Sequence, residues 1–222
     1  GASNDTLDGG AGNDSIDASQ GGNDNIAGGD GNDYINFGSN GLTNNGGDTV
    51  AGGDGIDTVE SAHVPFNSIT DGAFANFSSV EVLNLTGNAN SVTTIGANAQ
   101  AGGIRTVNMN GAGNDVLNAG AYTADLLVND NGGAGNDTLT GGADADQFIF
   151  SHATSGTANA DTITDFSRTD GDKIAIDLSD FGITGTAGAI PTADITYGSY
   201  ASLTEGVNFS GTGNAKFVVD IS

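Results

Sequence analysis

Large aliphatic residues in positions 1–60 occur one at a time, mostly between polar or small residues. The segments SID, YIN and TVE each place a single Ile or Val between polar neighbours. Such alternation predicts half-buried β-strands. Each strand spans only about three residues before a turn rich in Gly, Asn and Asp. We expect one set of side chains to point inward as a thin apolar ladder: Ile16, Ile26, Ile35, Val50 and Val59.

The turns and strands together form a nine-residue repeat, Gly-Gly-x-Gly-x-Asp-x-apolar-x. Full matches are GGAGNDSID from Gly9, GGDGNDYIN from Gly28, GGDGIDTVE from Gly52 and GGAGNDTLT from Gly132. NGAGNDVLN from Asn110 lacks the first Gly, and GGADADQFI from Gly141 has Asp144 at the fourth position. Partial matches surround Asp5, Asp24 and Asp48, and a remnant surrounds Asp125. This period predicts a β-solenoid, in which stacked units bury a shared core.

The turn half of the repeat has the chemistry of a calcium site. Glycine permits positive φ and lets carbonyl oxygens converge, and Asp adds a hard anionic oxygen. Ca²⁺ takes about six to eight oxygens, more than one unit supplies. Two units make one coil, so turns about 18 residues apart should share an ion. Asp14 and Asp33 are 19 positions apart, as are Asp5 and Asp24, which fits a small bulge near Ala18.

We therefore expect several Ca²⁺ ions, held by side chains and backbone carbonyls of the turns. The predicted ligands of the first block are Asp5, Gly10, Gly12, Asp14, Asp24, Gly29, Gly31, Asp33, Asp48, Gly53, Gly55 and Asp57. Those of the second block are Asn110, Gly111, Gly113, Asp115, Asp125, Gly133, Gly135, Asp137, Gly142, Asp144 and Asp146. Asp48 and Asp125 fit least well, because insertions after Asp33 and around Asp125 break the strict spacing. Ordinary hairpins are the alternative, but they need longer strands between their turns.

The rest of the chain lacks the full repeat. Residues 61–109 contain SVEVLNLTG, NSVTTIG and GIRTVNMNG, which we interpret as solenoid coils without calcium, a small independent β-sandwich being the alternative. Their predicted buried set is Val80, Val82, Leu83, Leu85, Val107 and Met109. The chain thus divides into a first calcium block (1–60), plain coils (61–109), a second calcium block (110–150) and a β-rich capping segment (151–222). The residues placed to cover the open end are Phe148, Phe150, Ile163, Phe166, Ile174, Ile176, Leu178 and Phe181.

Composition sharpens this picture. The 222 residues include 25 Asp, three Glu, 38 Gly and only four basic residues, for a formal net charge of −24. Such a chain is either a solvated acidic coil or one whose carboxylates are neutralised by cations. Scarce Lys and Arg argue against nucleic acid, and zero Cys excludes thiolate sites. We expect no membrane span and no N-terminal signal peptide. The chain begins inside a repeat, so we expect it to be the C-terminal piece of a longer protein.

The repeats over 1–60 and 110–150 resemble those of the RTX (repeats-in-toxin, haemolysin-type) family. The resemblance implies an all-β parallel β-roll with Ca²⁺ between successive turns, and export by type I secretion machinery with an uncleaved C-terminal signal. Residues 160–182 resemble the capping segment that follows RTX repeats. The final NAKFVVDIS resembles a type I signal, although the order of its acidic and apolar residues departs from the commoner pattern. Runs such as VEVLNLTG resemble bacterial surface-layer proteins.

No catalytic constellation is evident. His63 and His152 are isolated, and the chain has no His-Glu-x-x-His, Gly-x-Ser-x-Gly or phosphate-binding loop. We expect a secreted, non-enzymatic protein of the bacterial cell surface that self-associates in a lattice, with cell-surface polysaccharide as a further partner. The alternative is the folding and secretion module of an enzyme or toxin whose catalytic domain lies upstream. Unrelated solenoids, such as ice-binding ones, are a third class.

Overall fold

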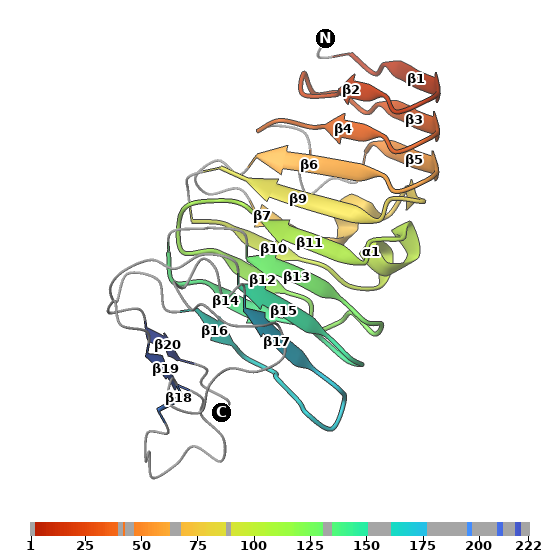
Figure 1. The fold of residues 1–222 in the computed structure, drawn as a ribbon. Coiled ribbons are helices and arrows are strands. Elements are labelled where there is room, and N and C mark those ends of the chain that lie inside the picture. Colours follow the sequence, from red (N-terminus) through yellow and green to blue (C-terminus); the bar gives the residue numbers. More distant parts are fainter. Residues whose placement is uncertain are drawn as a thin grey trace.

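The computed structural model shows a stack of parallel strands (Figure 1). It describes residues 3–39, 42, 47–62, 68–87, 90–130, 135–150 and 161–176, together with 195–196, 208–210 and 216–218. Three sheets form the stack: sheet A of four strands, sheet B of eight and sheet C of five. Every neighbouring pair within them is parallel. This confirms the predicted parallel β-roll.

The strands are short, as the sequence pattern predicts. Sheet A holds β1 (Thr6–Ala11), β3 (Asn25–Asp30), β5 (Thr49–Asp54) and β8 (Phe77–Ser78). Sheet B holds β2 (Ser15–Asp17), β4 (Tyr34–Asn36), β6 (Thr58–Ala62), β9 (Val82–Thr86), β11 (Thr106–Met109), β13 (Leu127–Asp130), β15 (Gln147–Phe150) and β17 (Lys173–Ile176). Sheet C holds β7 (Ser68–Ile69), β10 (Val92–Thr94), β12 (Val116–Asn118), β14 (Thr138–Thr140) and β16 (Thr162–Ile163).

Sheet B runs through the whole stack, whereas the opposite wall changes from sheet A to sheet C. The change falls in one coil, where the chain enters sheet C as β7 and passes a short 3-10 helix, η1 (Asp71–Phe74). It then closes sheet A as β8 and returns to sheet B as β9. The strands of the middle segment therefore pair with both repeat blocks: β9 pairs with β6, and β11 pairs with β13. No separate β-sandwich is present in the described part of this segment.

An apolar column fills the interior behind sheet B. In register along the sheet stand Ile16, Ile35, Val59, Leu83, Val107, Val128 and Phe148, all of them buried. The five residues predicted as an inward ladder in the first block are all buried. Of the set predicted for the middle segment, Val82 is the exception. It is only partly buried, because β9 alternates and the inner positions belong to Leu83 and Leu85.

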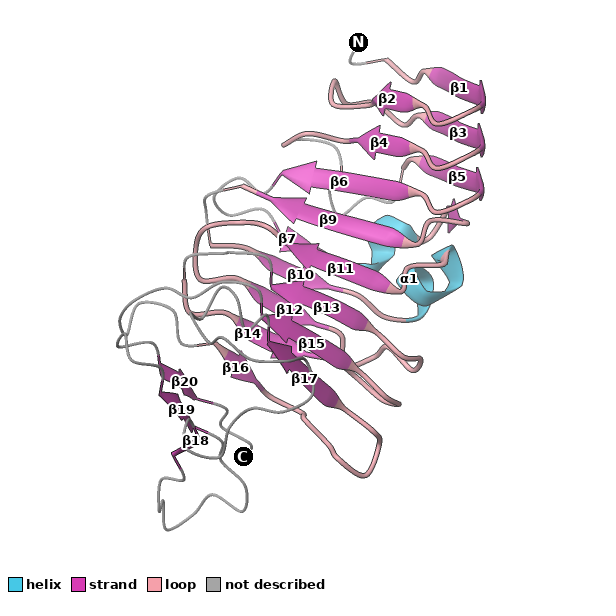
Figure 2. Cartoon of the chain, viewed as in Figure 1, coloured by secondary structure: helices cyan, strands magenta, loops and turns pink. Residues whose placement is uncertain are grey.

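A helix that the sequence pattern did not predict interrupts the middle segment (cyan in Figure 2). Helix α1 (Ala97–Gly102) ends at Gly103, whose φ of 107° gives the left-handed termination typical of glycine. Its first turn is capped from the preceding coil by Asp71, which accepts the N–H groups of Gly96, Asn98 and Ala99 at 2.7, 3.0 and 3.0 Å. One carboxylate thus satisfies donors that a helix N-terminus leaves open.

The outer face of sheet B carries a ladder of side-chain amides. The Nδ2 group of Asn108 donates to Asn84 Oδ1 at 2.6 Å, and Nδ2 of Asn129 donates to Asn108 Oδ1 at 2.7 Å. The three residues are aligned on β9, β11 and β13. Hydrogen bonds between side chains therefore reinforce the backbone pairing in the coils that carry no calcium motif.

Part of the predicted capping segment continues the solenoid. Strands β16 and β17 pair in parallel with β14 and β15, and Ile163 is buried while Phe166 and Ile174 pack against the core. Leu178 and Phe181 lie outside the described residues. Strands β18 (Ile195–Thr196), β19 (Asn208–Ser210) and β20 (Lys216–Val218) form an antiparallel sheet. Among the described residues, no helix has the length and apolar character that a membrane span requires.

Candidate calcium sites

The turns between sheets A and B carry a ladder of carboxylates. Asp14, Asp33 and Asp57 directly precede β2, β4 and β6. The N–H of Asp14 donates to Asp33 Oδ1 at 2.8 Å, and the N–H of Asp33 donates to Asp57 Oδ1 at 2.8 Å. The two steps span 19 and 24 residues. The insertion after Asp33 thus lengthens the spacing from 19 to 24 residues, as the sequence indicates, and the turns still remain in register.

The second oxygen of each of these carboxylates has no hydrogen-bond donor. Oδ2 of Asp14, Asp33 and Asp57 is buried and accepts no hydrogen bond. Asp33 exposes 2% of its surface and Asp57 exposes 0%. A buried anionic oxygen without a donor is costly unless a cation neutralises it. Each coil of the ladder thus provides a buried anionic oxygen that a bound cation would stabilise.

Backbone carbonyls converge on the same oxygens. An ideal Cβ at Gly9, the first residue of its repeat, would lie 2.5 Å from the carbonyl oxygen of Gly28 and 2.9 Å from Asp14 Oδ2. In the next coil a Cβ at Gly28 would collide with Asp33 Oδ2 and with the carbonyl oxygen of Gly52. Only glycine keeps this space open. Carboxylate and carbonyl oxygens in a flexible arrangement are the ligands of Ca²⁺, so the residues present fit that ion.

The other glycines of the repeats adopt the backbone that their motif requires. Positive φ is found at Gly10, Gly12, Gly29, Gly31, Gly53, Gly55, Gly113 and Gly142. Asp144 takes the same conformation without being glycine, with a φ of 70°. A Cβ at Gly31 would collide with the carbonyl of Gly12, and one at Gly135 with the carbonyl of Gly113. These carbonyls therefore lie directly against the fourth-position glycines of the neighbouring coil.

The turns that lead into sheet A form a second ladder. The N–H of Asp5 donates to Asp24 Oδ1, and that of Asp24 to Asp48 Oδ1, both at 2.8 Å. Asp48, which fits the spacing poorly in the sequence, is thus aligned with the others. Burial raises its pKa against the lowering effect of the hydrogen bond from Asp24, and the charge of Asp24 raises it further. A cation bound beside this carboxylate would favour its charged form and oppose the effect of burial.

The second block repeats the arrangement at the turns that lead into sheet C. The N–H of Ser91 donates to Asp115 Oδ1 at 2.8 Å, that of Asp115 to Asp137 Oδ1 at 2.7 Å, and that of Asp137 to Asp161 Oδ1 at 2.9 Å. A Cβ at Gly111 would lie 2.9 Å from Asp115 Oδ2. Of two further predicted ligands, Asn110 is exposed, and Gly133 lies outside the described residues.

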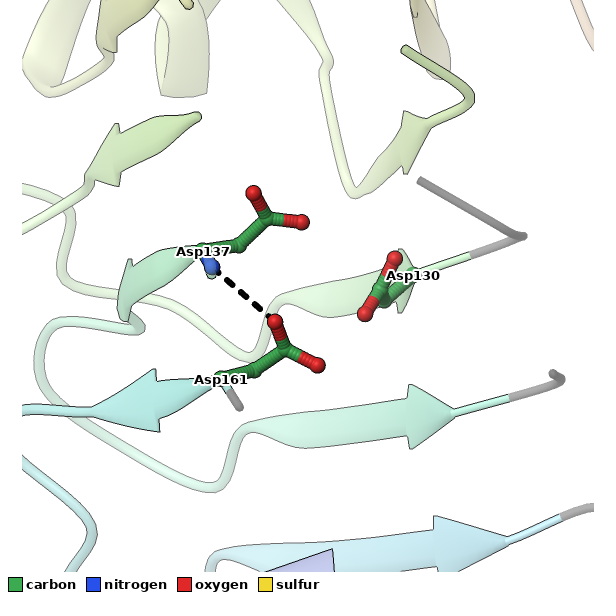
Figure 3. Close-up of side chains that lie close together, drawn as sticks. All are labelled: Asp130, Asp137 and Asp161. Atoms are coloured by element: carbon green, nitrogen blue, oxygen red, sulfur yellow. Dashed lines mark hydrogen bonds between the residues drawn. The ribbon is translucent and has the colours of Figure 1, made fainter. Parts of the chain in front are cut away.

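A further carboxylate, that of Asp130, joins this ladder from sheet B. Figure 3 shows Asp130, at the end of β13, beside Asp137 and Asp161. One oxygen of each lies within 4.8 Å of the others, a spacing that suits a shared metal ion. Burial raises the pKa of Asp137 to about 7, although the hydrogen bond from Asp115 lowers it, and the charges of Asp161 and Asp115 raise it further.

Asp146 is the centre of a second acidic group. It accepts the N–H of Leu126 at 2.9 Å through Oδ1 and donates its own N–H to Asp172 Oδ1 at 2.9 Å, while its Oδ2 is buried and accepts no hydrogen bond. Burial raises its pKa to about 7, opposed by the hydrogen bond from Leu126. The negative charges of Asp172, Asp165 and Asp125 act in the same direction as burial.

Asp125, a predicted ligand, lies next to the carboxylate ladder. Leu126 stands at the ladder position, and Asp125 precedes it by one residue. Its Oδ1 accepts the N–H of Ala145 at 3.2 Å, just as Asn13 Oδ1 accepts the N–H of Asn32 at 2.9 Å. Asp125 therefore corresponds to the Asn of the repeat rather than to its Asp.

Several acidic residues at these turns were not predicted. Asp161 and Asp172 are each followed by one residue and then Ile, so they keep the Asp-x-apolar half of the repeat without its glycines. Glu81 keeps the same spacing with Glu in place of Asp. Asp130 carries no such signal, because its neighbours read as an ordinary strand. Gly9, Gly28 and Gly52 are absent from the predicted set, which in the first block contains only the second and fourth glycines of each repeat.

Comparison with known families agrees with the geometry. The RTX calcium-binding nonapeptide repeat matches in four copies, at residues 1–22, 19–40, 42–61 and 131–150. No curated protein and no solved structure gives a match. The matched copies coincide with the turns whose carboxylates stack, namely those of Asp14, Asp33, Asp57 and Asp137. The chain therefore carries RTX calcium-binding nonapeptide repeats, and they lie in a parallel β-solenoid.

Proposed function

We propose that this chain is the calcium-dependent folding and assembly region of a secreted, surface-layer-like protein of the bacterial cell surface, and that it acts without catalysis. The observation that carries the proposal is the series of stacked carboxylates whose second oxygen is buried without a hydrogen bond. When no cation is bound, these buried oxygens raise the free energy of the folded chain. The RTX repeats at the same turns identify the cation as Ca²⁺.

Calcium binding and folding are one event in this proposal. Without the ion, a formal net charge of −24 opposes compaction, and the many glycines add chain entropy that folding must overcome. A site that exists only in the folded state contributes about 2.7 kcal/mol when free calcium exceeds its Kd a hundredfold. Extracellular calcium modules work at about 10⁻⁴–10⁻³ M. The chain would stay unfolded in a calcium-poor cytoplasm and fold after export, for which type I machinery is the proposed route.

A structural role is supported by the continuity of sheet B. Eight strands from β2 to β17 form one sheet through both repeat blocks and the middle segment, which gives an elongated body (Figure 1). The carboxylates of the described turns are engaged in hydrogen-bonded ladders. On this proposal Ca²⁺ also bridges neighbouring copies in a surface lattice, and cell-surface polysaccharide anchors it.

Circular dichroism during a calcium titration tests the folding proposal. In EDTA we expect the β signal to be lost, and added Ca²⁺ to restore it in a cooperative transition, whereas equal ionic strength from NaCl leaves the chain unfolded. A full β signal in EDTA would show that folding does not depend on the ion and would contradict the proposal.

The assembly role needs a separate experiment. Electron microscopy of the purified chain in millimolar calcium should show ordered two-dimensional sheets that disperse in EDTA. Folded but monomeric protein under all calcium concentrations would contradict assembly and favour the alternative, a folding and secretion module of a secreted enzyme or toxin. A protease or lipase motif in the sequence upstream of Gly1 would favour that alternative in the same way.

A further inference from the structure

The last turn of the first block faces a coil that has no repeat motif. In the RTX turns, each Asp stacks on the Asp of the next coil, and each first Gly faces a carbonyl of the next coil. Asp57 belongs to the last matched copy, which ends at residue 61. The coil that follows presents Ser79 and Glu81 at the corresponding places.

Glu81 continues the carboxylate ladder beyond the repeats. Asp57 donates its N–H to Glu81 Oε2 at 2.9 Å, as Asp33 donates its N–H to Asp57 Oδ1 at 2.8 Å. The N–H groups of Glu81 and Val82 return hydrogen bonds to the carbonyl of Asp57 at 3.1 and 3.0 Å. The Glu side chain, longer by one methylene, thus reaches the place that Asp occupies in the other turns.

Ser79 supplies the carbonyl. A Cβ at Gly52 would collide with the carbonyl oxygen of Ser79 and with Asp57 Oδ2, as a Cβ at Gly28 would collide with the carbonyl of Gly52 and Asp33 Oδ2. Ser79 adopts a φ of 51°, in the left-handed region that residues other than glycine rarely enter. Strained backbone of this kind is frequent at functional sites.

We call the place where the last repeat turn meets the following coil the junction. The anionic oxygen Asp57 Oδ2, at this junction, has no hydrogen-bond donor. Asp57 is 0% exposed, and its Oδ2 is buried and accepts no hydrogen bond. Glu81 lies close enough for its charge to raise the pKa of Asp57, in addition to the larger effect of burial. Two carboxylates and a carbonyl therefore converge where the repeat motif has already ended.

We propose that this junction binds a Ca²⁺ ion through Asp57 Oδ2, the Ser79 carbonyl and the Glu81 carboxylate. The proposal rests on calcium binding by the repeat turns and extends it to residues that the motif does not contain. Carboxylates combined with a backbone carbonyl favour Ca²⁺ over Mg²⁺, which keeps most of its water. An ion here links β6 to β9, and so connects the calcium-bound block to the middle segment.

Equilibrium dialysis with radioactive calcium on the whole chain tests the junction. Glu81→Gln keeps an oxygen for the Asp57 N–H but removes the charge, so saturating calcium should load about one ion fewer per chain, or one class of ion should bind at least about tenfold more weakly. Glu81→Asp, which restores the residue of the repeat, should keep the wild-type number. Asp54→Asn is the matched control, because it removes one exposed charge from the same turn.

The outcomes separate this site from the general proposal. If the wild-type chain binds no calcium, the proposed function itself fails. If the wild type binds calcium and Glu81→Gln binds the same number with the same affinities, only the junction site is overturned. Should Glu81→Gln not fold, a crystal structure of the wild type with calcium decides. An ion about 2.3–2.6 Å from Asp57 Oδ2 and the Ser79 carbonyl supports the site, and its absence there overturns it.

Discussion

Each aspartate of the ladders has two separate tasks. In Asp33, Oδ1 accepts the N–H of Asp14 and thereby holds two turns in register, while Oδ2 remains buried without a hydrogen bond. The first oxygen positions the second, so the calcium ligands are arranged by the same contacts that stack the coils. An Asn in this place would keep the positioning bond and lose the charge that binds the ion.

The glycine that opens each turn should be as important as the aspartate. Gly28→Ala places a Cβ against Asp33 Oδ2 and the carbonyl of Gly52, so we expect a loss of about 1–3 kcal/mol in the free energy of unfolding and weaker calcium binding. Urea unfolding in calcium measures the first and calcium titration the second. Gly72→Ala is the control, since its Cβ would meet only Thr70 Oγ1 at 3.6 Å. Equal stability of the two variants would contradict the argument.

The raised pKa of Asp137 predicts opposite pH dependences with and without calcium. The ordinary pKa of Asp is 3.8, and burial raises that of Asp137 to about 7. Between pH 3.8 and about pH 7, Asp137 therefore keeps its proton in the calcium-free folded chain and releases it in the unfolded chain. Stability in EDTA should therefore fall as pH rises through this window, by at most about 1.4 kcal/mol per pH unit. Calcium needs the ionised carboxylate, so its stabilising effect should grow over the same window.

Thermal unfolding from pH 4 to 8, with calcium and with EDTA, measures both trends. If folding in EDTA is too weak to follow, the increase in calcium affinity with pH tests the same pKa. Asp137→Asn removes one of two such groups and should make both curves shallower, while Asp146, whose pKa burial also raises to about 7, accounts for the remaining slope. Parallel curves for the wild type in calcium and in EDTA would contradict the interpretation.

At the scale of elements, the sequence predicts the strands well and their partners less well. Period-two alternation around single apolar residues such as Ile35 and Val59 was enough to predict short strands and their inward face, and both residues are buried. The register across the insertion after Asp33 was not predictable, because motif spacing cannot show where extra residues loop out. Hydrogen bonds across 24 residues hold that register.

Other elements depended on contacts that no local pattern contains. Helix α1 spans only six residues and owes its N-terminus to Asp71 in another coil. Asp130 shares the inner column of sheet B with Met109 and Phe150, in register on both sides, so by pattern alone its place should be apolar. The acidic side chain is explained by its neighbours Asp137 and Asp161, because the fold places one oxygen of each of the three at a spacing that suits a shared metal ion.

The amide ladder on sheet B should stabilise the fold without affecting the ions. Asn108→Asp removes the donor to Asn84 and places an anion beside its carbonyl oxygen, while the bond from Asn129 can remain. We expect about 1–3 kcal/mol less stability in urea at saturating calcium, with calcium affinity per site unchanged. Asn118→Asp serves as the control, because Asn118 is exposed and its acceptor role toward Gly120 survives in Asp. A large drop in calcium affinity for Asn108→Asp would contradict this separation.

For the whole molecule, the two calcium blocks and the middle segment share one sheet. The sequence suggests blocks separated by plain coils, but motif content does not show whether those coils depend on their neighbours. In the structure, β9 pairs with β6, and β11 pairs with β13. Edge strands left by an unfolded block would expose unpaired N–H and C=O groups and apolar core. The middle coils should thus be unstable alone.

Hydrogen exchange followed by mass spectrometry tests this dependence. Removing calcium should abolish protection in β9 and β11 together with β4 and β15, although residues 82–109 contain no full repeat. The physical reason is that stacked coils gain most of their stability from their neighbours, so the loss of the calcium-bound ends exposes the core column at Leu83 and Val107. Glu81→Gln should reduce protection of β9 at intermediate calcium before that of β4 changes, whereas Asp54→Asn should not. Protection of β9 and β11 that persists in EDTA would show instead that the middle segment folds independently of calcium.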